Sequence, residues 1–346
     1  MTRIAIIGAG AIGGTLGALL ARDGQDVTLL GRAEHVAAMR RDGLRVDGAL
    51  GAFTVPVAAC ESLDFRPDLA LLTVKTQQVA AAVREHQDRL TGVPLVTLQN
   101  GVRSDDLVAE LLPREQLLSG VVMMNAQYLT PGRVTISYPG SLVIGRPFGP
   151  NDDHAGEVAR LLGRAVPTSL SGNIRGAHWL KLIVNLNNAL AAITDRSVRQ
   201  IYEDPYLGRL GVRLMREGMR VAARSAIRLE SLPDLTVGLA RLSTLLPVGL
   251  SARVAAAKAR RIEREWPLVV STLQSIRRGS GTEIDYLNGE VVRQGERVGA
   301  PAPLNAAAVE LVHRVEQTGR FLSADEVREA MAADQAGDRS PVQPRS

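Results

Sequence analysis

The stretch IAIIGAGAIGGTLGALLA, residues 4–21, decides the fold of this chain. It carries no charge and is flanked by Arg3 and Arg22, so a membrane-spanning helix and a secretory signal peptide both have to be considered. Glycine at positions 8, 10, 13, 14 and 17 argues against both, because each glycine costs a helix about 0.8–1 kcal/mol relative to alanine. We therefore interpret the stretch as a buried strand, a glycine-rich turn and a helix.

The turn reads G-x-G-x-x-G and lies between a β-branched run and the helix expected over residues 11–22. In this context the first glycine permits a tight turn, the second lets the backbone approach a pyrophosphate, and the third lets helix and strand pack closely. The amino end of the helix attracts the phosphates. The pattern predicts a dinucleotide site that includes Gly8, Ala9, Gly10, Ala11, Ile12 and Gly13.

The composition is that of an ordinary globular protein, with 45% apolar and 22% charged residues among 346. The net charge of +5 is spread along the chain and aromatics make up only 3%, so we expect no nucleic-acid partner and no membrane partner. The single cysteine, Cys60, excludes an internal disulfide, and the histidines lack ligand spacing, so we predict no metal. We expect a cytoplasmic protein; the sequence carries no sign of its oligomeric state and is compatible with a homodimer.

Short apolar runs alternate with amphipathic stretches up to about residue 171, which is typical of a mostly parallel sheet covered by helices. Strands are predicted at 26–30, 68–74, 94–98 and 117–124, and helices at 34–41 and 77–90. Residues 44–57 are strand material interrupted by two glycines. Residues 133–137 and 141–145 predict an antiparallel hairpin.

The segment PTSLSG, residues 167–172, is predicted to be a linker, beyond which the periodicity is helical. Helices are expected over 174–194, 205–228, 233–246, 254–265, 283–298 and 303–318. The polar end, 334–346, is predicted to be disordered. We expect an α/β domain over 1–171, an all-α domain over 172–325, and a tail.

The second strand ends in Leu29-Leu30-Gly31-Arg32. A carboxylate at this place binds the ribose hydroxyl of NAD, whereas an arginine suits the 2′-phosphate of NADP. Arg32 can donate two parallel hydrogen bonds to a phosphate, so NADP(H) is predicted. Glu34, two residues later, is the alternative, since its carboxylate could bind the ribose of NAD. Lys75 and Gln78, and then Asn100, follow later strands, where ligands bind in such sheets.

The chain has 41 basic residues, of which only Lys75, Lys181 and Lys258 are lysines. In one continuous helix, Lys181, Asn185 and Asn188 would share a narrow face. Such polar groups are costly in a core unless they meet a polar ligand, and a solvated or capped face is the alternative. Further on, Ser271 precedes a T-E-I-D run in which Thr282 can cap a helix and Asp285 favours its first turn.

Taken together, these motifs resemble the ketopantoate reductase (2-dehydropantoate 2-reductase) family over about residues 1–320. The resemblance rests on the G-x-G-x-x-G, Arg32, the V-K-x-x-Q segment at 74–78, Asn100-Gly101, the W-x-K-L-x-x-N helix at 179–185, and the segment 271–289. The resemblance implies a Rossmann domain followed by an all-α domain like that of 6-phosphogluconate dehydrogenases. It further implies that the helical domain closes over the Rossmann domain.

By this resemblance the chain reduces 2-dehydropantoate to (R)-pantoate with NADPH, a step of pantothenate biosynthesis, and Lys181 is the general acid. The substrate-binding residues are then Asn100, Lys181, Asn185, Asn188, Ser271 and Glu283. Besides the glycine-rich loop, the cofactor-binding residues are Arg32, Lys75, Gln78, Asn100, Ala126 and Glu283.

The chain departs from the family pattern at one amide. The family commonly has it eight residues after the lysine, where this chain has Ala189, while Asn188 comes at seven. Two alternatives stay open: a reductase of another 2-oxo acid on the same fold, and a non-catalytic dinucleotide sensor.

Overall fold

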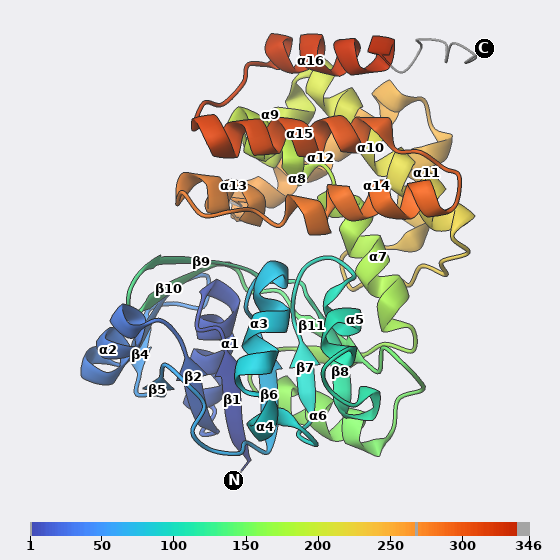
Figure 1. Ribbon diagram of the computed structural model, residues 1–346. Coiled ribbons are helices and arrows are strands. Elements are labelled where there is room, and N and C mark those ends of the chain that lie inside the picture. Colours follow the sequence, from blue (N-terminus) through green and yellow to red (C-terminus); the bar gives the residue numbers. More distant parts are fainter. Residues whose placement is uncertain (1, 267–268, 338–346) are drawn as a thin grey trace, which may run out of the picture. The chain divides into compact units, whose positions relative to one another are not determined.

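The computed structural model describes residues 2–266 and 269–337 (Figure 1). The chain forms two compact units. Unit 1 comprises Met1–Lys181 and Leu229–Asp234, and unit 2 comprises Leu182–Arg228 and Leu235–Ser346. The chain thus divides directly after Lys181, later than the 171/172 boundary that the PTSLSG segment suggested.

The larger sheet of unit 1 has eight strands in the order β12-β11-β8-β7-β6-β1-β2-β5. These strands are β1 (Arg3–Ile7), β2 (Asp26–Leu30), β5 (Ala58–Cys60), β6 (Leu69–Leu72), β7 (Leu95–Thr97), β8 (Leu117–Val122), β11 (Leu142–Gly145) and β12 (Thr168–Leu170). Neighbours pair in parallel except β11 with β8, which confirms the expected mostly parallel sheet.

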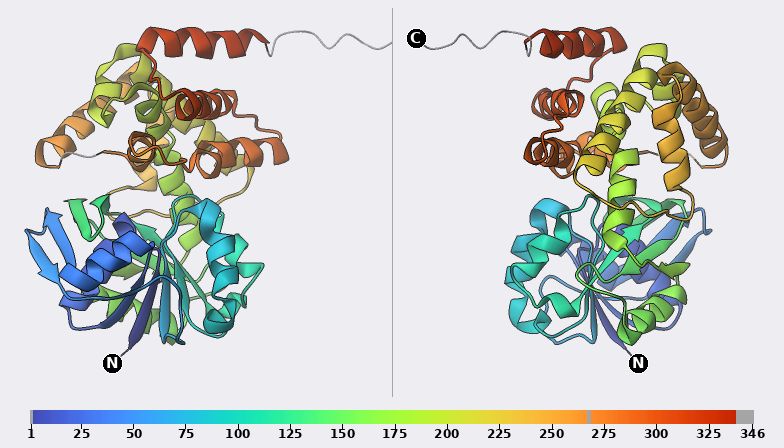
Figure 2. Two further views of the ribbon diagram at one scale, coloured as in Figure 1. Left: turned by 60° about the vertical axis from the view of Figure 1, so that its left-hand side comes forward. Right: turned by 90° about the vertical axis from the view of Figure 1, so that its right-hand side faces the viewer.

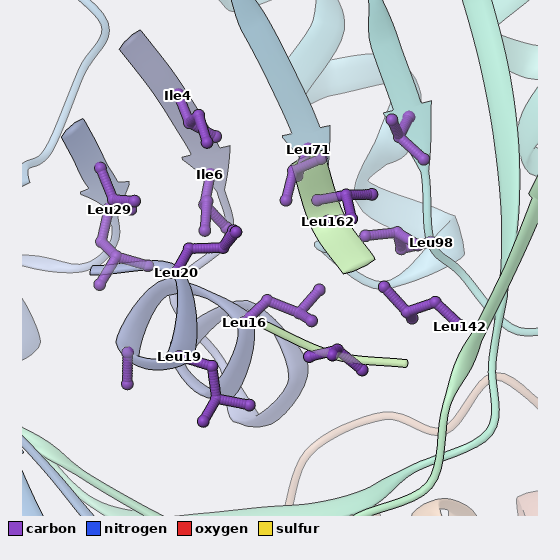
Figure 3. Packing of buried hydrophobic residues seen from close by; sticks show 14 of the residues in the cluster. Ile4, Ile6, Leu16, Leu19, Leu20, Leu29, Leu71, Leu98, Leu142 and Leu162 are labelled. Carbon is purple, nitrogen blue, oxygen red and sulfur yellow. The ribbon is translucent and has the colours of Figure 1, made fainter. Parts of the chain in front are cut away.

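Helices cover both faces of this sheet, because successive strand residues point to opposite sides. On one face, α1 (Ala11–Arg22) and α6 (Asp153–Gly163) share a core with alternate strand residues. Figure 3 shows Leu16 and Leu20 of α1 among strand side chains that include Ile6 and Leu71. On the other face lie α3 (Val79–Glu85), α4 (Gln87–Leu90) and α5 (Ser104–Ala109). Figure 2 shows both layers of helices.

A second sheet of four strands has the order β4-β3-β10-β9. Its strands are β3 (Leu44–Gly48), β4 (Phe53–Val55), β9 (Asn125–Thr130) and β10 (Arg133–Tyr138). The predicted hairpin between 133–137 and 141–145 is therefore wrong, because β10 lies in this sheet and β11 in the larger one. Tyr138-Pro139-Gly140 carries the chain from one sheet to the other, and a Cβ at Gly140 would collide with the Met123 carbonyl oxygen.

The predicted linker and the long helix over 77–90 also need correction. Residues 168–170 form the edge strand β12, whose partner β11 supplies the hydrogen bonds. The 77–90 region consists of η1 (Thr76–Gln78), α3 and α4, with the break at His86. The remaining elements of unit 1 are α2 (Ala33–Asp42) and η2 (Arg114–Gln116).

In the described part of unit 2, the regular elements are all helical, as predicted. They are the end of α7 (Ile174–Asn185), α8 (Asn188–Thr194), α9 (Val198–Glu203), α10 (Pro205–Arg224), α11 (Val237–Leu245), α12 (Val248–Glu265), α13 (Ser271–Arg277), η3 (Ile284–Tyr286), α14 (Asn288–Arg297), α15 (Pro303–Thr318) and α16 (Ala324–Gly337). Of the predicted tail, 334–337 belong to α16, and 338–346 lie outside the described residues.

Candidate active site

The glycine-rich loop connects β1 to α1 in the way that the sequence motif requires. Gly8 has a φ of +110°, and a Cβ there would lie 2.7 Å from the Val74 nitrogen. At Gly13 a Cβ would collide with the Gly8 carbonyl oxygen. A Cβ at Gly10 would meet nothing within 4 Å, so the side of the loop at which a ligand can approach the backbone is open. Gly10 is the N-cap of α1 and has no side chain to occupy the N–H groups of the first turn.

The loop lies where the strand order reverses. The chain leaves β1 for β2 on one side and later returns to β6 on the other side of β1. Thr73, after β6, closes this junction, since its Oγ1 donates to the carbonyl oxygens of Gly8 at 2.7 Å and of Ile7 at 3.2 Å. Lys75 and Gln78 follow within the same turn, at the carboxyl end of β6. A switch point of this kind is where open α/β sheets bind ligands.

His35, which lies in no sequence motif, ties the glycine-rich loop to the second sheet. Its Nε2 contacts the Ala9 carbonyl oxygen at 2.7 Å, and its Nδ1 accepts from the Gly132 N–H at 2.8 Å. Burial lowers the pKa of His35, and the neutral ring satisfies both bonds when Nε2 carries the hydrogen. His35 therefore fixes the direction of the Ala9 carbonyl. Its position three residues after Arg32 was the only available signal in the sequence.

Arg32 and Glu34 lie exposed at the end of β2, where the sequence put them. Arg32 is the N-cap of α2, and Glu34 is in the first turn of this helix. The amino end of α2 adds a partial positive charge beside the Arg32 guanidinium. The other predicted cofactor residue of this unit, Ala126, is buried in β9 and so belongs to the second sheet.

Lys181 brings its amine to the carboxyl edge of the large sheet. Its Nζ donates to Asn100 Oδ1 at 2.8 Å and to the Val122 carbonyl oxygen at 2.7 Å. Asn100 follows β7, and Val122 is the last residue of β8. All three residues belong to unit 1. The sequence predicted Lys181 and Asn100 separately, and the structure joins them in one hydrogen-bonded pair.

The turn that carries Asn100 is held from several sides. Gln99 Nε2 donates to the carbonyl oxygens of Leu72 and Val74, at 2.8 and 3.1 Å. Thr76 Oγ1 donates to the Asn100 carbonyl oxygen at 3.2 Å, and Gly101 supplies the φ of +85° that the turn needs. These bonds connect the end of β7 to the end of β6, so Asn100 and Lys75 lie on neighbouring strand ends.

A buried polar group behind Lys181 was also missed from the sequence. His178 Nε2 lies 2.8 Å from Ser119 Oγ, and Thr97 Oγ1 donates to Asp105 Oδ1 at 2.5 Å. Burial raises the pKa of Asp105 to about 6 despite hydrogen bonds from Thr97 and Ser119. The only sequence signal was that His178 precedes Lys181 by one helical turn.

The remaining predicted substrate residues belong to unit 2. Asn185 is the half-buried last residue of α7, Ser271 is the exposed first residue of α13, and Glu283 is half-buried at the N-cap of η3. The prediction that Lys181, Asn185 and Asn188 share one helix face is wrong for Asn188. The helix ends at Asn185, and Asn188 begins α8.

The break after Asn185 has an identifiable cause in the amides that follow it. The Asn187 side chain donates back to the Val184 carbonyl oxygen and replaces the helical partner that this oxygen would have. The Leu186 carbonyl oxygen accepts from Asn288 Nδ2 at 3.1 Å, and the same amide nitrogen lies 2.9 Å from Asn305 Oδ1. Asn288, in the L-N-G part of the family motif, therefore supports the backbone of unit 2.

The described residues also bear on two other kinds of site, a metal site and a membrane-spanning segment. Within 2–266 and 269–337, no three His, Cys, Asp or Glu residues are grouped so that they could hold a metal ion. None of the helices in these ranges combines the length and the apolar character that crossing a bilayer requires.

The fold of unit 1 and the glycine-rich loop at its switch point are those of the Rossmann class of dinucleotide-binding domains. Residues 4–148 match the family model described as "Ketopantoate reductase PanE/ApbA", and residues 173–316 match "Ketopantoate reductase PanE/ApbA C terminal". The chain belongs to the ketopantoate reductase family.

Individual relatives and solved structures are similar to this chain over nearly its whole length. The chain is 31% identical over 320 residues to a 2-dehydropantoate 2-reductase of Pyrococcus horikoshii, covering 92% of this chain and 98% of the relative. A crystal structure of a PanE/ApbA family ketopantoate reductase from Ralstonia eutropha JMP134 matches with a TM-score of 0.76 at 31% identity, over 91% of this chain and 98% of that one. D-mandelate dehydrogenase, in a ternary structure with NADH and anilino(oxo)acetate, matches with a TM-score of 0.79 at 25% identity, over 91% and 99%.

Proposed function

We propose that this protein reduces 2-dehydropantoate to (R)-pantoate with NADPH, a step of pantothenate biosynthesis. The single observation that carries the proposal is the Lys181–Asn100 pair, which lies at 2.8 Å on the carboxyl edge of a dinucleotide-binding sheet. Family membership over both halves of the chain supports the choice of substrate. The reductase of Pyrococcus horikoshii supports it at the level of the whole chain.

The residues of unit 1 fit a phosphorylated dinucleotide. The first turn of α1, which follows Gly10, presents backbone N–H groups that have no intrahelical partner, and the empty space beside Gly10 leaves room for the pyrophosphate. Arg32, exposed at the end of β2, provides the fork for the 2′-phosphate. When bound, NADPH supplies the hydride for the C2 carbonyl. Lys75, Gln78, Asn100 and Ala126 of unit 1, with Glu283 of unit 2, complete the proposed contacts.

Lys181 acts as the general acid in this proposal. Reduction of the ketone builds negative charge on its oxygen, and an ammonium at hydrogen-bond distance stabilises that charge and delivers the proton. The Asn100 Oδ1 and Val122 carbonyl acceptors hold the amine in one place, which lowers the entropic cost of the reactive arrangement. Because Asn100 accepts from Lys181 through Oδ1, its Nδ2 is the atom that donates to the substrate.

Residues of unit 2 complete substrate binding in the proposal. The amides of Asn185 and Asn188 and the hydroxyl of Ser271 are suited to the carboxylate and hydroxyl groups of pantoate. Glu283 contacts bound ligand as well. Asn188 begins α8, so in this proposal its side-chain amide reaches the ligand from the start of that helix.

The D-mandelate dehydrogenase neighbour favours one further candidate, a reductase of another 2-oxo acid on the same fold. Purified protein with NADPH should be offered 2-dehydropantoate, 2-oxoisovalerate and phenylglyoxylate, and NADPH absorbance followed. We expect the highest kcat/KM with 2-dehydropantoate, since it carries both the branched carbon and the hydroxyl. A higher kcat/KM with phenylglyoxylate would favour the alternative reductase, and NADPH binding without turnover of any acid would favour a sensor.

A further inference from the structure

His178 lies in α7 one helical turn before Lys181 and is buried, with 4% of its surface exposed. Residues three apart on a helix share a face, so the imidazole and the amine both point toward the sheet. His178 reaches Ser119, and Lys181 reaches Val122. Both of these partners belong to β8, three positions apart. The helix is therefore attached to one strand by two side chains, His178 at Ser119 and Lys181 at the last residue, Val122.

The second contact of the imidazole is with the turn that carries Asn100. A hydrogen bond to the Gly101 backbone raises the pKa of His178, which identifies the carbonyl oxygen as the acceptor. Burial, followed by the charge of Lys181, outweighs this effect and lowers the pKa to about 3. The ring is thus neutral at physiological pH. With one nitrogen donating to Gly101, the other contact of the ring is with Ser119, whose Oγ lies 2.8 Å from Nε2.

The chain of hydrogen bonds continues behind Ser119. Asp105, buried at the start of α5, bonds to Ser119 and to Thr97 of β7. Thr97 Oγ1 also lies 3.3 Å from Ser119 Oγ. His178, Ser119, Asp105 and Thr97 therefore form one buried network that connects α7, β8, α5 and β7. The turn with Asn100 lies between Thr97 and Asp105 and is enclosed by the network at both ends.

We propose that His178 is a positioning residue for the reduction: with Ser119 and Asp105 it fixes the Asn100–Gly101 turn and the rotation of α7, and so aligns the Lys181 amine. This inference rests on the proposed role of Lys181 as the general acid. A residue that only filled space would not need two hydrogen bonds. The two bonds of His178 go to Gly101 and Ser119, which are close in sequence to Asn100 and Val122, the two hydrogen-bond partners of Lys181. Gly101 is adjacent to Asn100, and Ser119 shares its strand with Val122.

Two substitutions separate positioning from packing. His178→Leu fills the space with an apolar side chain and removes both hydrogen bonds. His178→Gln retains one donor and one acceptor. We expect His178→Leu to lower kcat about 10–100-fold, because misplacement by about 1 Å costs that much, with NADPH affinity unchanged. His178→Gln should recover most of the loss. The matched control is His86→Leu, a buried histidine of the same unit that lies at the end of α3.

A readout that needs neither substrate nor cofactor comes from the lysine content. The chain has three lysines, so mass spectrometry after brief acetylation reports Lys181 against Lys75 and Lys258 in one sample. In His178→Leu we expect Lys181 to be acetylated at least about threefold faster, as a loosened segment opens more often. Lys75 and Lys258 should react at their wild-type rates. Ser119→Ala, which removes one bond and keeps the imidazole, should give a smaller change in the same direction.

The kinetics of the wild-type protein separate the proposed function from the positioning role of His178. If the wild type does not reduce 2-dehydropantoate, the proposed function fails, and the labelling pattern still tests the alignment of Lys181. If the wild type is active and His178→Leu keeps a wild-type kcat and a wild-type labelling rate at Lys181, the positioning role is overturned. It is also overturned if His86→Leu gives the same losses or if all three lysines react faster together.

Discussion

Asn100 and Lys181 are 81 positions apart in the sequence, and their side chains meet at 2.8 Å. The pair joins the turn after β7 to a helix that contains the boundary between unit 1 and unit 2. Each partner alone is an ordinary polar side chain. Together they give an ammonium with a fixed direction, which is what proton delivery to a developing alkoxide requires.

Arg32 is the residue that we expect to distinguish NADPH from NADH. A hydrogen-bonded contact with a charged group contributes about 1.5–3 kcal/mol, so Arg32→Ala should raise the Kd of NADPH about 10–150-fold. The Kd of NADH, which lacks the 2′-phosphate, should change little. Titration of protein fluorescence with each cofactor measures both values.

The same helix offers the control for this substitution. Arg41 lies at the far end of α2 and pairs with Asp42, so Arg41→Ala removes an equal charge away from the site. Equal losses for NADPH and NADH in Arg32→Ala would remove the phosphate assignment. Glu34→Ala tests the competing reading, in which a carboxylate binds the ribose and NADH binding falls instead.

At the residue scale, the sequence identified chemical types at strand ends and could not identify buried contacts. Lys181 and Asn100 stood out because a lysine is rare in this chain and an amide followed a strand. His35 and His178 did not, since each is defined by what it touches: Ala9 and Gly132 for one, Ser119 and Gly101 for the other. Such contacts depend on chain pairing that no local pattern reports.

The element that carries Glu283 is held by α15. The Thr282 N–H donates to Glu316 Oε1 at 2.6 Å. His313 lies between two carboxylates, with Nδ1 2.8 Å from Glu316 Oε2 and Nε2 3.0 Å from Asp285 Oδ1. Asp285, whose position in the sequence predicted a first-turn acid, therefore also anchors the η3 turn to a neighbouring helix.

This arrangement predicts a pH-dependent contribution to stability. Burial lowers the pKa of His313, but the hydrogen bonds and charges of Asp285 and Glu316 outweigh it and raise the pKa. A raised folded-state pKa means that the contribution is complete below about pH 6.5 and is lost as the pH rises through the folded value. Burial raises the pKa of Glu316, but its hydrogen bonds outweigh this and lower it, so a second loss follows on acidification below about pH 4.5.

His313→Ala should therefore lower the free energy of unfolding more at pH 6 than at pH 9. The groups are partly exposed, so the cost at pH 6 is expected to be about 0.5–1 kcal/mol. Thermal midpoints of variant and wild type at the two pH values measure it. His154→Ala, a half-buried histidine on α6 that lies beside one carboxylate, Glu157, and not two, gives the background. An equal cost of His313→Ala at both pH values would contradict the assigned ion pairs.

At the element scale, periodicity located most strands and helices but not their partners. The helix predicted over 174–194 is interrupted because side-chain amides of Asn187 and Asn288 take carbonyl oxygens at the junction. The predicted hairpin failed because Pro and Gly mark a turn without saying which sheet the next strand joins. The motif-bearing loops were predicted best, since their glycines serve local geometry.

At the scale of the whole molecule, the proposed function draws on both units. Unit 1 supplies the dinucleotide loop, Arg32, Asn100 and the amine of Lys181, and unit 2 supplies Ser271 and Glu283. The chain divides within α7 directly after Lys181, so the proposed general acid and Asn185 are on one helix that serves both units. Family models match residues 4–148 and 173–316, so both units contain matched sequence.

The most direct measurement compares Lys181→Ala with Lys258→Ala, an unrelated lysine on α12, in 2-dehydropantoate reduction and in NADPH binding. Loss of a general acid costs about 10²–10⁴-fold in rate, so kcat of Lys181→Ala should fall at least about 100-fold while its NADPH Kd stays near the wild-type value. Lys258→Ala should behave as wild type in both assays. A Lys181→Ala protein that turns over 2-dehydropantoate at close to the wild-type rate would contradict the account.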